Sequence, residues 1–264
     1  MSPNDPDQPE IFSREWYNEY FRRAVSSPAH SQFCQRVYGI DLCQHGLMDK
    51  VELDFLISLI EPNSKILEVG WSNGHITEYI HERTAAQILG IDFSDVAIEQ
   101  ALARTRSKSK SLRFAQVDLT REAAPGGDYD YIILIDSIYF LGEFQDSLAR
   151  LGQELNAGGR MIVSVFDVKQ EDDPDDVLLP DQTSLARALK ALGLSYTWHD
   201  FTANVRAHGR NNYQVVEELK TAFIQEGNQF LYEARAAENR FFKQSAEQNR
   251  IVRYMYVIAQ DASG

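Results

Sequence analysis

The sequence predicts a doubly wound α/β fold, and three observations support this prediction. After Pro62, short apolar segments alternate with amphipathic helical segments. The apolar segments contain little polar alternation, which is typical of parallel strands covered on both faces. No internal repeat or low-complexity linker divides the 264 residues, so we expect one domain with additions. The right-handed crossover rule then favours an open sheet with helices on both sides.

The beginning of the chain predicts a tail followed by a helical cap. Residues 1–10, rich in Asp and Pro, predict a disordered tail. Residues 11–60 predict the cap, because apolar side chains recur at helical spacing in IFSREWYNEYFRRAV and in VELDFLISLI. The glycine-punctuated segment 38–49, YGIDLCQHGLMD, predicts a loop between these helices.

Residues 63–205 predict the core of the sheet, and the rest of the chain predicts additions to it. The expected core strands are 65–70, 87–92, 112–118, 131–136, 160–166 and 194–202. The helices expected between them are 75–83, 95–105, 143–155 and 184–192. Residues 206–249 predict a helical insertion with a break at Gly227. Residues 250–264 supply a seventh strand, IVRYMYVIA, and a short tail.

Composition excludes several kinds of partner. The net charge is −13, and no Lys/Arg cluster exceeds the run RTRSKSK at 104–110, whereas phosphate binding requires a broad basic face. We therefore expect neither nucleic acid nor an anionic membrane as partner. No apolar run approaches the roughly 18–20 residues that span a bilayer, and no signal peptide is evident, so we expect a cytoplasmic protein. Cys34 and Cys43 have no companions at ligand spacing, which predicts reduced thiols and no metal site.

Glycine or aspartate residues stand at the ends of four successive expected strands. In an open parallel sheet, ligands bind beyond the carboxyl ends of the strands. Gly70 and Gly74 follow the first strand, where a tight turn and a close approach of the helix to a ligand need glycine. Asp92 ends the second strand, 22 residues after Gly70, and can accept hydrogen bonds from both hydroxyls of a ribose. Asp118 and Asp136 end the third and fourth strands, beside the adenine and the reactive end of a nucleoside ligand.

These motifs resemble those of class I (Rossmann-like) S-adenosylmethionine-dependent methyltransferases of the small-molecule type. The resemblance covers about residues 50–170 and rests on KILEVGWSNG, GIDFS, VDLT, YDYIILIDSIYFL and LNAGGRMIVSVF. It implies a seven-stranded, mostly parallel sheet whose last strand is antiparallel, with S-adenosylmethionine as cofactor. It also implies that Glu68, Gly70 and Gly74 line the methionine end, that Asp92 holds the ribose, that Asp118 faces adenine and that Asp136 lies near the sulfonium. The further residues assigned to cofactor binding are Trp71, Ser72, Phe93 and Leu119.

The sequence departs from the family in the glycine-rich turn and offers two candidates for the chemistry. Ser72 replaces the middle glycine of the usual G-x-G-x-G, which serine can do where its φ is negative. Methyl transfer needs alignment of the acceptor and, for a protonated acceptor, a base. Tyr139, shortly after the fourth strand, and His45, in the Gln-His-Gly loop, are the candidate catalytic residues. Further candidates for the acceptor pocket are Tyr17, Tyr20 and Tyr213.

The resulting hypothesis is transfer of a methyl group from S-adenosylmethionine to an N or O atom of a small molecule, by a monomer or homodimer. Two alternatives stay open. An NAD(P)-dependent oxidoreductase also places an acid where Asp92 stands, although it expects G-x-G-x-x-G. A non-catalytic nucleotide-binding protein of the same fold is the second alternative. We expect the N-terminal helices and the helical insertion to cover the acceptor site, because the sheet itself needs neither.

Overall fold

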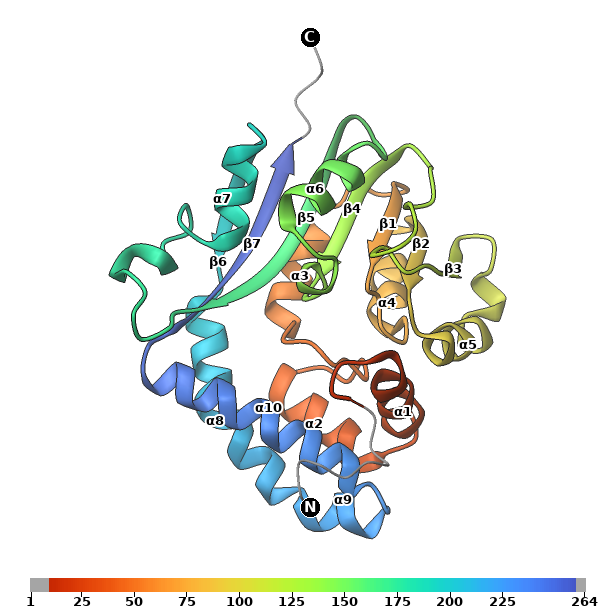
Figure 1. Ribbon diagram of the computed structural model, residues 1–264. Coiled ribbons are helices and arrows are strands. Elements are labelled where there is room, and N and C mark those ends of the chain that lie inside the picture. The colour runs from red at the N-terminus through yellow and green to blue at the C-terminus, as the bar shows by residue number, and fades with distance from the viewer. Residues whose placement is uncertain (1–9, 260–264) are drawn as a thin grey trace.

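The computed structural model describes residues 10–259 and has a seven-stranded sheet at its centre (Figure 1). Nine of the ten residues of the predicted tail, 1–9, and the end of the chain, 260–264, lie outside the described residues. The strand order is β3-β2-β1-β4-β5-β7-β6. The strands are β1 (Lys65–Val69), β2 (Gln87–Asp92), β3 (Leu112–Gln116), β4 (Tyr129–Ile135), β5 (Leu155–Val168), β6 (Ser195–Asp200) and β7 (Ile251–Ala259).

The predicted fold class is confirmed by the strand directions. Neighbours from β3 to β5 pair in parallel, whereas β7 pairs antiparallel with both β5 and β6. The order reverses between β1 and β4, and the carboxyl ends of these two strands lie side by side. This is the position where doubly wound sheets bind ligands.

Helices cover both faces of the sheet. The helices are α1 (Arg14–Ala24), α2 (Pro28–Tyr38), α3 (Lys50–Ser58), α4 (His75–Thr84), α5 (Asp95–Arg104), α6 (Phe144–Gly152), α7 (Ser184–Ala191), α8 (Thr202–Glu218), α9 (Lys220–Gln225) and α10 (Gln229–Glu247). The side chains of β1 alternate between two cores: Ile66 packs with α3 and α4, and Leu67 packs with α6 and α7. Both faces are therefore apolar, as the low polar alternation of the strands predicts.

Helices from the two ends of the chain form a separate cap over the carboxyl ends of the strands. The cap contains α1, α2, α8, α9 and α10, which lie together below the sheet in Figure 1. Its core is aromatic, with Tyr20, Phe33 and Phe223 fully buried. The predicted insertion at 206–249 corresponds to α8–α10; α8 begins at Thr202, directly after β6, and Gly227 (φ 72°) separates α9 from α10.

One connection and one strand differ from a regular alternation of strands and helices. No helix lies between β3 and β4 in the described chain, where residues 117–128 contain Pro125 and two glycines. Strand β5 runs from Leu155 to Val168, longer than the predicted 160–166, with an irregular register opposite Tyr129 and Tyr131. Among residues 10–259, no helix combines the length and apolar character needed to cross a membrane.

Candidate cofactor and acceptor site

The turn between β1 and α4 is tightly wound, and both of its glycines are required by contact as well as by φ. Gly70 (φ 71°) and Gly74 (φ 75°) adopt the left-handed region. A Cβ on Gly70 would lie 2.4 Å from Cβ of Ser137, and one on Gly74 would lie 2.7 Å from the Trp71 ring. Ser72 does not meet the condition of a negative φ under which serine readily replaces this glycine, because its φ is 64°. This winding lets the Ser72 N–H reach the next strand.

Asp92 receives that N–H at the end of β2. Its Oδ2 accepts from Ser72 N at 3.1 Å, and its Oδ1 accepts from Ser94 N at 2.9 Å. The residue is only 7% exposed, and burial raises the pKa of its carboxyl to about 6 against the opposing backbone hydrogen bonds. Asp92 thus ties the glycine-rich turn to β2 at the position predicted to hold a ribose.

Several buried polar atoms around this turn have no hydrogen-bond partner within residues 10–259. They are Glu68 Oε2, Trp71 Nε1, Ser72 Oγ, His75 Nε2 and Thr77 Oγ1. Burial also raises the pKa of Glu68 to about 7. Buried polar groups in folded proteins are normally paired, so this cluster indicates a polar ligand at the turn. A ligand with an ammonium, a carboxylate and hydroxyls, such as S-adenosylmethionine, fits the donors and acceptors present.

The remaining predicted cofactor residues occupy different surroundings. The Trp71 ring is a core group, with its centroid 4.4 Å from that of Phe114. Phe93 faces the cap, where its ring lies 5.6 Å from that of Tyr17. Asp118 lies two residues beyond β3, its Oδ1 accepts hydrogen bonds from the N–H and hydroxyl of Thr120, and these bonds lower the pKa of Asp118. Leu119 is buried beside them.

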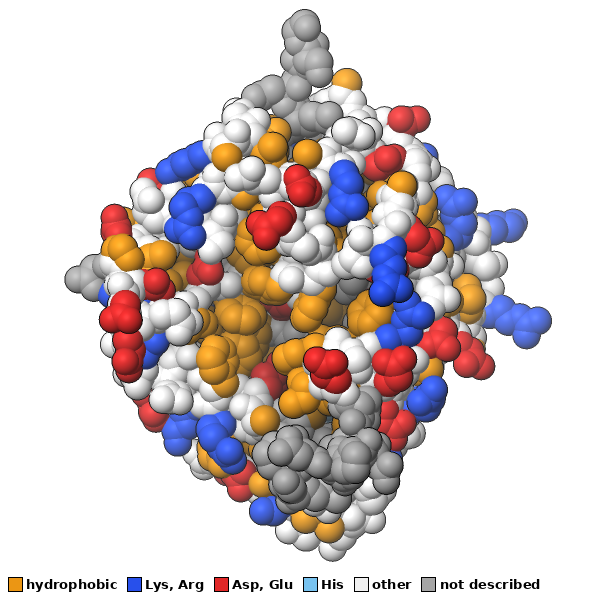
Figure 2. Space-filling view, in the orientation of Figure 1, with side chains coloured by type: hydrophobic (Ala, Val, Ile, Leu, Met, Phe, Trp, Pro, Cys, Tyr) orange, Lys and Arg blue, Asp and Glu red, His pale blue; other side chains and the backbone are white. Residues whose placement is uncertain are grey.

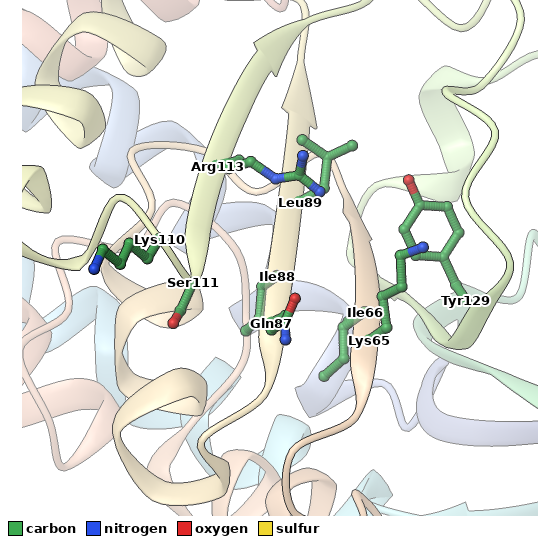
Figure 3. Close-up of a pocket in the computed structure, with 9 residues that line it drawn as sticks. All are labelled: Lys65, Ile66, Gln87, Ile88, Leu89, Lys110, Ser111, Arg113 and Tyr129. Atoms are coloured by element: carbon green, nitrogen blue, oxygen red, sulfur yellow. The ribbon is translucent and has the colours of Figure 1, made fainter.

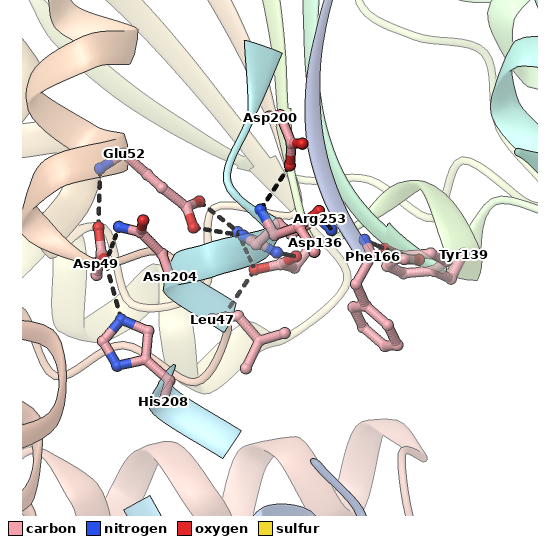
Figure 4. Close-up of polar contacts among 11 residues, drawn as sticks. Leu47, Asp49, Glu52, Asp136, Tyr139, Phe166, Asp200, Asn204, His208 and Arg253 are labelled. Carbon is pink, nitrogen blue, oxygen red and sulfur yellow. Dashed lines mark hydrogen bonds and ion pairs between the residues drawn. The ribbon is translucent and has the colours of Figure 1, made fainter. Parts of the chain in front are cut away.

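Asp136 belongs to a buried ion cluster (Figure 4). Arg253 on β7 donates to Asp136 Oδ1 at 2.7 Å and to both oxygens of Glu52 on α3 at 2.7 Å. The side chains of Arg253 and Glu52 are fully buried. Burial raises the pKa of Glu52 to about 8 in spite of the adjacent guanidinium. The cluster joins the beginning of α3 to the end of β4 and the beginning of β7.

The loop predicted between the first helices crosses the carboxyl ends of β1 and β4, and we call residues 39–49 the strap. The core holds it through Asn73, which donates to Cys43 O at 3.2 Å, and through Asp136 Oδ2, which accepts from Leu47 N at 2.8 Å. The cap holds it through Arg235 on α10, which donates to the carbonyls of Gln44 and His45. The strap is therefore clamped between the sheet and the cap.

His45, a predicted catalytic residue, lies on this strap inside an aromatic box. Its ring centroid is 5.5 Å from Trp16, 5.3 Å from Tyr17 and 4.8 Å from Tyr20, each in an edge-to-face arrangement. Burial, with Arg235 nearby, lowers the pKa of His45 to about 3. The imidazole is thus neutral at physiological pH.

Tyr139, the other predicted catalytic residue, uses its hydroxyl structurally. The hydroxyl donates to Phe166 O at 3.1 Å and also accepts from Phe166 N, which fixes the turn after β4 to β5. Burial raises the pKa of Tyr139 well above its usual value. Of the acceptor-pocket candidates, Tyr17 and Tyr20 lie at the strap, whereas Tyr213 pairs with Arg240 at the α8–α10 contact.

Sequence reasoning missed four residues that organise this site: Glu52, Arg235, Glu238 and Arg253. Arg253 carried a usable signal, because a lone arginine inside the apolar strand IVRYMYVIA requires a buried partner. The partner itself could not be identified, since Glu52 precedes it by 201 residues. Arg235 and Glu238 lie in a helix rich in charged residues and carried no such signal.

A cavity of about 220 Å³ opens at the opposite end of the strands (Figure 3). It is lined by the first residues of β1 and β2, with Lys65, Lys110 and Arg113 as its charged side chains. Because ligands of doubly wound sheets bind at the carboxyl ends of the strands, this cavity is separate from the site at the strap.

Comparison with known proteins gives the same assignment for the core. Residues 66–159 match a family model described as "Methyltransferase domain". The core of the chain therefore matches a methyltransferase domain over residues 66–159. The alternative of an NAD(P)-dependent oxidoreductase is not supported by this match. S-adenosylmethionine is the cofactor of the family, and a phosphoethanolamine N-methyltransferase 2 from Haemonchus contortus has been solved with it.

The relatives of this methyltransferase domain act on different acceptors. An eEF1A lysine and N-terminal methyltransferase of Bos taurus is 27% identical over 112 residues, which are 39% of this chain and 16% of that protein. Phosphoethanolamine N-methyltransferase 1 of Arabidopsis thaliana is 27% identical over 133 residues, which are 50% of this chain and 27% of that protein. The matched region thus spans about a quarter or less of these relatives.

Solved structures extend the likeness to the cap. The [4+2]-cyclase SpnF has a TM-score of 0.69 at 19% identity, with 95% of this chain and 97% of that chain covered. The Haemonchus contortus enzyme in complex with phosphomonomethylethanolamine and S-adenosylhomocysteine also has a TM-score of 0.69, at 15% identity, with 97% and 62% covered. These values show a shared fold, and a fold that includes a cyclase does not by itself define the reaction.

Proposed function

We propose that this protein transfers a methyl group from S-adenosylmethionine to an N or O atom of a small-molecule acceptor. The observation that supports this most directly is the cluster of unpaired buried polar atoms at the glycine-rich turn, next to Asp92. The cytoplasmic location of the protein and its state as a monomer or homodimer stay predictions from the sequence.

The residues of the turn and of the strand ends would hold the cofactor. Glu68 and the backbone of Gly70–Gly74 would bind the amino-acid end, and Asp92 would accept the two ribose hydroxyls. Bound S-adenosylmethionine supplies an electrophilic methyl group. The chain's part is to orient an acceptor on the axis of that group and to exclude water, and alignment of this kind supplies up to about 7–11 kcal/mol in favourable intramolecular cases.

Enclosure of the strand ends favours a small acceptor over a protein side chain. The strap, α1 and α10 cover the region beside Asp136, and Trp16, Tyr17 and Tyr20 are almost fully buried there. A side chain of a folded protein partner would have to pass these segments to reach the methyl group, whereas a small molecule could fit beneath them. The small-molecule assignment therefore rests on the cap and not on the core domain.

Two measurements test the proposal. Calorimetry should show binding of S-adenosylhomocysteine but not of NADH. Asp92→Ala should weaken that binding at least tenfold, because hydrogen bonds to a charged carboxylate contribute about 1.5–3 kcal/mol each. A screen of amines, phenols, carboxylates and thiols with labelled cofactor should then show methyl transfer. Unchanged affinity in Asp92→Ala, or absence of any transfer, would contradict the assignment.

A further inference from the structure

The carboxyl group of Glu238, on α10, faces the strap from the cap side. Its Oε2 accepts from Arg235 Nη1 at 2.8 Å, and the same nitrogen donates to His45 O at 3.0 Å. The side chain of Arg235 is fully buried, whereas that of Glu238 remains 22% exposed. Arg235 therefore fixes Glu238 beside the strap while part of the Glu238 side chain stays exposed.

Glu238 and Asp136 are linked to the residues on either side of Gly46. Glu238 is linked through Arg235 to His45 O, and Asp136 accepts the N–H of Leu47. A Cβ on Gly46 would lie 2.6 Å from Asp136 Oδ2. Burial raises the pKa of Glu238 although Arg235 acts to lower it, and Asp136 adds to the rise, which makes this carboxylate a better proton acceptor.

A series of ring contacts runs between the sheet and the cap. It connects the segment before α1, the turn after β4, β5 and α10, through Phe12–Phe140, Tyr139–Phe140, Tyr139–Phe166 and Phe166–Phe242. Phe140 is 44% exposed and Phe241, next to Phe242, is 49% exposed. Figure 2 shows hydrophobic side chains gathered around a hollow between the sheet and the cap, with both acidic and basic side chains near its rim.

Among residues 10–259, the guanidinium groups nearest the strap are those of Arg235, which donates to it, and Arg253, which donates to Asp136 beneath it. Both side chains are fully buried and each is paired with a carboxylate, although Arg235 Nε itself has no hydrogen-bond partner. Three carboxyl groups, those of Glu52, Asp136 and Glu238, accompany these two guanidinium groups. An anionic acceptor would gain no free cation here, whereas a cation would gain a carboxylate and nearby aromatic rings.

We propose that the acceptor is a hydrophobic amine whose ammonium group binds at Glu238, with its apolar body along the ring-lined hollow. This proposal rests on the methyl transfer proposed above. The ammonium first gives one proton to the Glu238 carboxylate, because a protonated nitrogen has no lone pair. The freed nitrogen then bonds to the methyl carbon as the carbon–sulfur bond breaks, which yields a methylammonium and a neutral thioether. The proton on Glu238 leaves to water when the product departs.

The test uses three probes on protein saturated with S-adenosylhomocysteine: 2-phenylethylamine, 3-phenylpropionate and phosphoethanolamine. Calorimetry should give a Kd for 2-phenylethylamine at least tenfold below that of 3-phenylpropionate, an anion without an amine, and that of phosphoethanolamine, a polar amine whose phosphate makes its net charge negative. Glu238→Gln keeps an acceptor for Arg235 but removes the charge, so it should weaken amine binding about tenfold or more. The Kd of S-adenosylhomocysteine should stay within about threefold of the wild-type value, which would show that the variant is folded.

Glu233→Gln, a carboxyl paired with Gln229 on the same helix, is the matched control and should leave all three probes unaffected. Three results would overturn the proposal: binding of 3-phenylpropionate or phosphoethanolamine as tight as that of 2-phenylethylamine or tighter, no binding of 2-phenylethylamine at millimolar concentration, or unchanged affinity for 2-phenylethylamine in Glu238→Gln. Loss of S-adenosylhomocysteine binding by the wild-type protein is a different result, because it would overturn the proposed function itself.

Discussion

Glu68 is buried near the end of β1 at the expense of stability. It is 2% exposed, and its Oε2 has no partner within residues 10–259. Its folded-state pKa of about 7 lies above the usual glutamate value of 4.5, so the folded protein holds a proton that the unfolded chain releases. The stabilisation present below pH 4.5 is therefore lost as the pH rises to about 7.

Glu68→Gln should stabilise the ligand-free protein at pH 8 by up to about 3 kcal/mol, since the neutral amide has no charge to bury. The advantage should vanish near pH 4.5, and the variant should bind S-adenosylhomocysteine more weakly than wild type. Urea unfolding at the two pH values measures this. Glu99→Gln, which changes an exposed carboxyl on α5, is the control and should show no such pH dependence.

Gly46 is fixed by the carboxylate that approaches it. In Gly46→Ala, the new Cβ would lie 2.6 Å from Asp136 Oδ2, so the strap or the ion cluster must shift. We expect a loss of about 1–3 kcal/mol in the free energy of unfolding, together with weaker cofactor binding. Gly152→Ala, with open space around its Cβ at the end of α6, should change neither quantity appreciably. Equal stability of the two variants would show that the strap can shift to accommodate the new Cβ without a loss of unfolding free energy.

At the scale of elements, α1 is hydrogen-bonded to the residues that follow Asp92 at the end of β2. Asn18 Nδ2 donates to Asp95 Oδ1 at 2.7 Å, and Asn18 Oδ1 accepts from the Ser94 hydroxyl at 2.6 Å. Ser94 also caps α5 and lies two residues after Asp92. The position of the helix and the conformation of the loop after β2 are thus coupled.

Asn18→Ala should therefore increase the dissociation rate of S-adenosylhomocysteine by about three- to tenfold, because two hydrogen bonds of about 0.5–1.5 kcal/mol each are lost. The thermal midpoint should fall only slightly. Stopped-flow displacement measures the rate. Glu19→Ala, whose ion pairs stay within α1, serves as the comparison. The same rate in both variants would mean that α1 does not limit release.

Local patterns predicted the core elements, but the contacts between distant segments could not be predicted. The glycine-rich turn and Asp92 can be identified from the sequence because turns and strand ends depend on a few adjacent residues. The clamp on the strap depends on Arg235, 190 residues after His45, and no local pattern couples the two. The packing of Trp71 could not be predicted either: its place in the turn predicts a cofactor contact, which stays a prediction, but does not indicate that its ring lies against Phe114.

At the scale of the whole molecule, the cap and the core meet at the strap, which has contacts to both. Because cofactor would add contacts to the turn below the strap, binding should reduce local opening of both layers. Amide exchange in α1 and in residues 39–49 should slow when S-adenosylhomocysteine binds, whereas exchange in α6 and α7, on the other face of the sheet, should not change. Protection limited to the glycine-rich turn would contradict a coupled cap.

The ion cluster also constrains the order in which the chain can finish folding. Arg253 follows Asp136 by 117 residues and Glu52 by 201. During synthesis both carboxyl groups leave the ribosome well before their guanidinium partner, and burial of an unpaired charge is strongly unfavourable. The ends of β4 and α3 must therefore stay hydrated until β7 pairs with β5. The region that would hold the reacting groups is completed last, so an unfinished chain presents no assembled site.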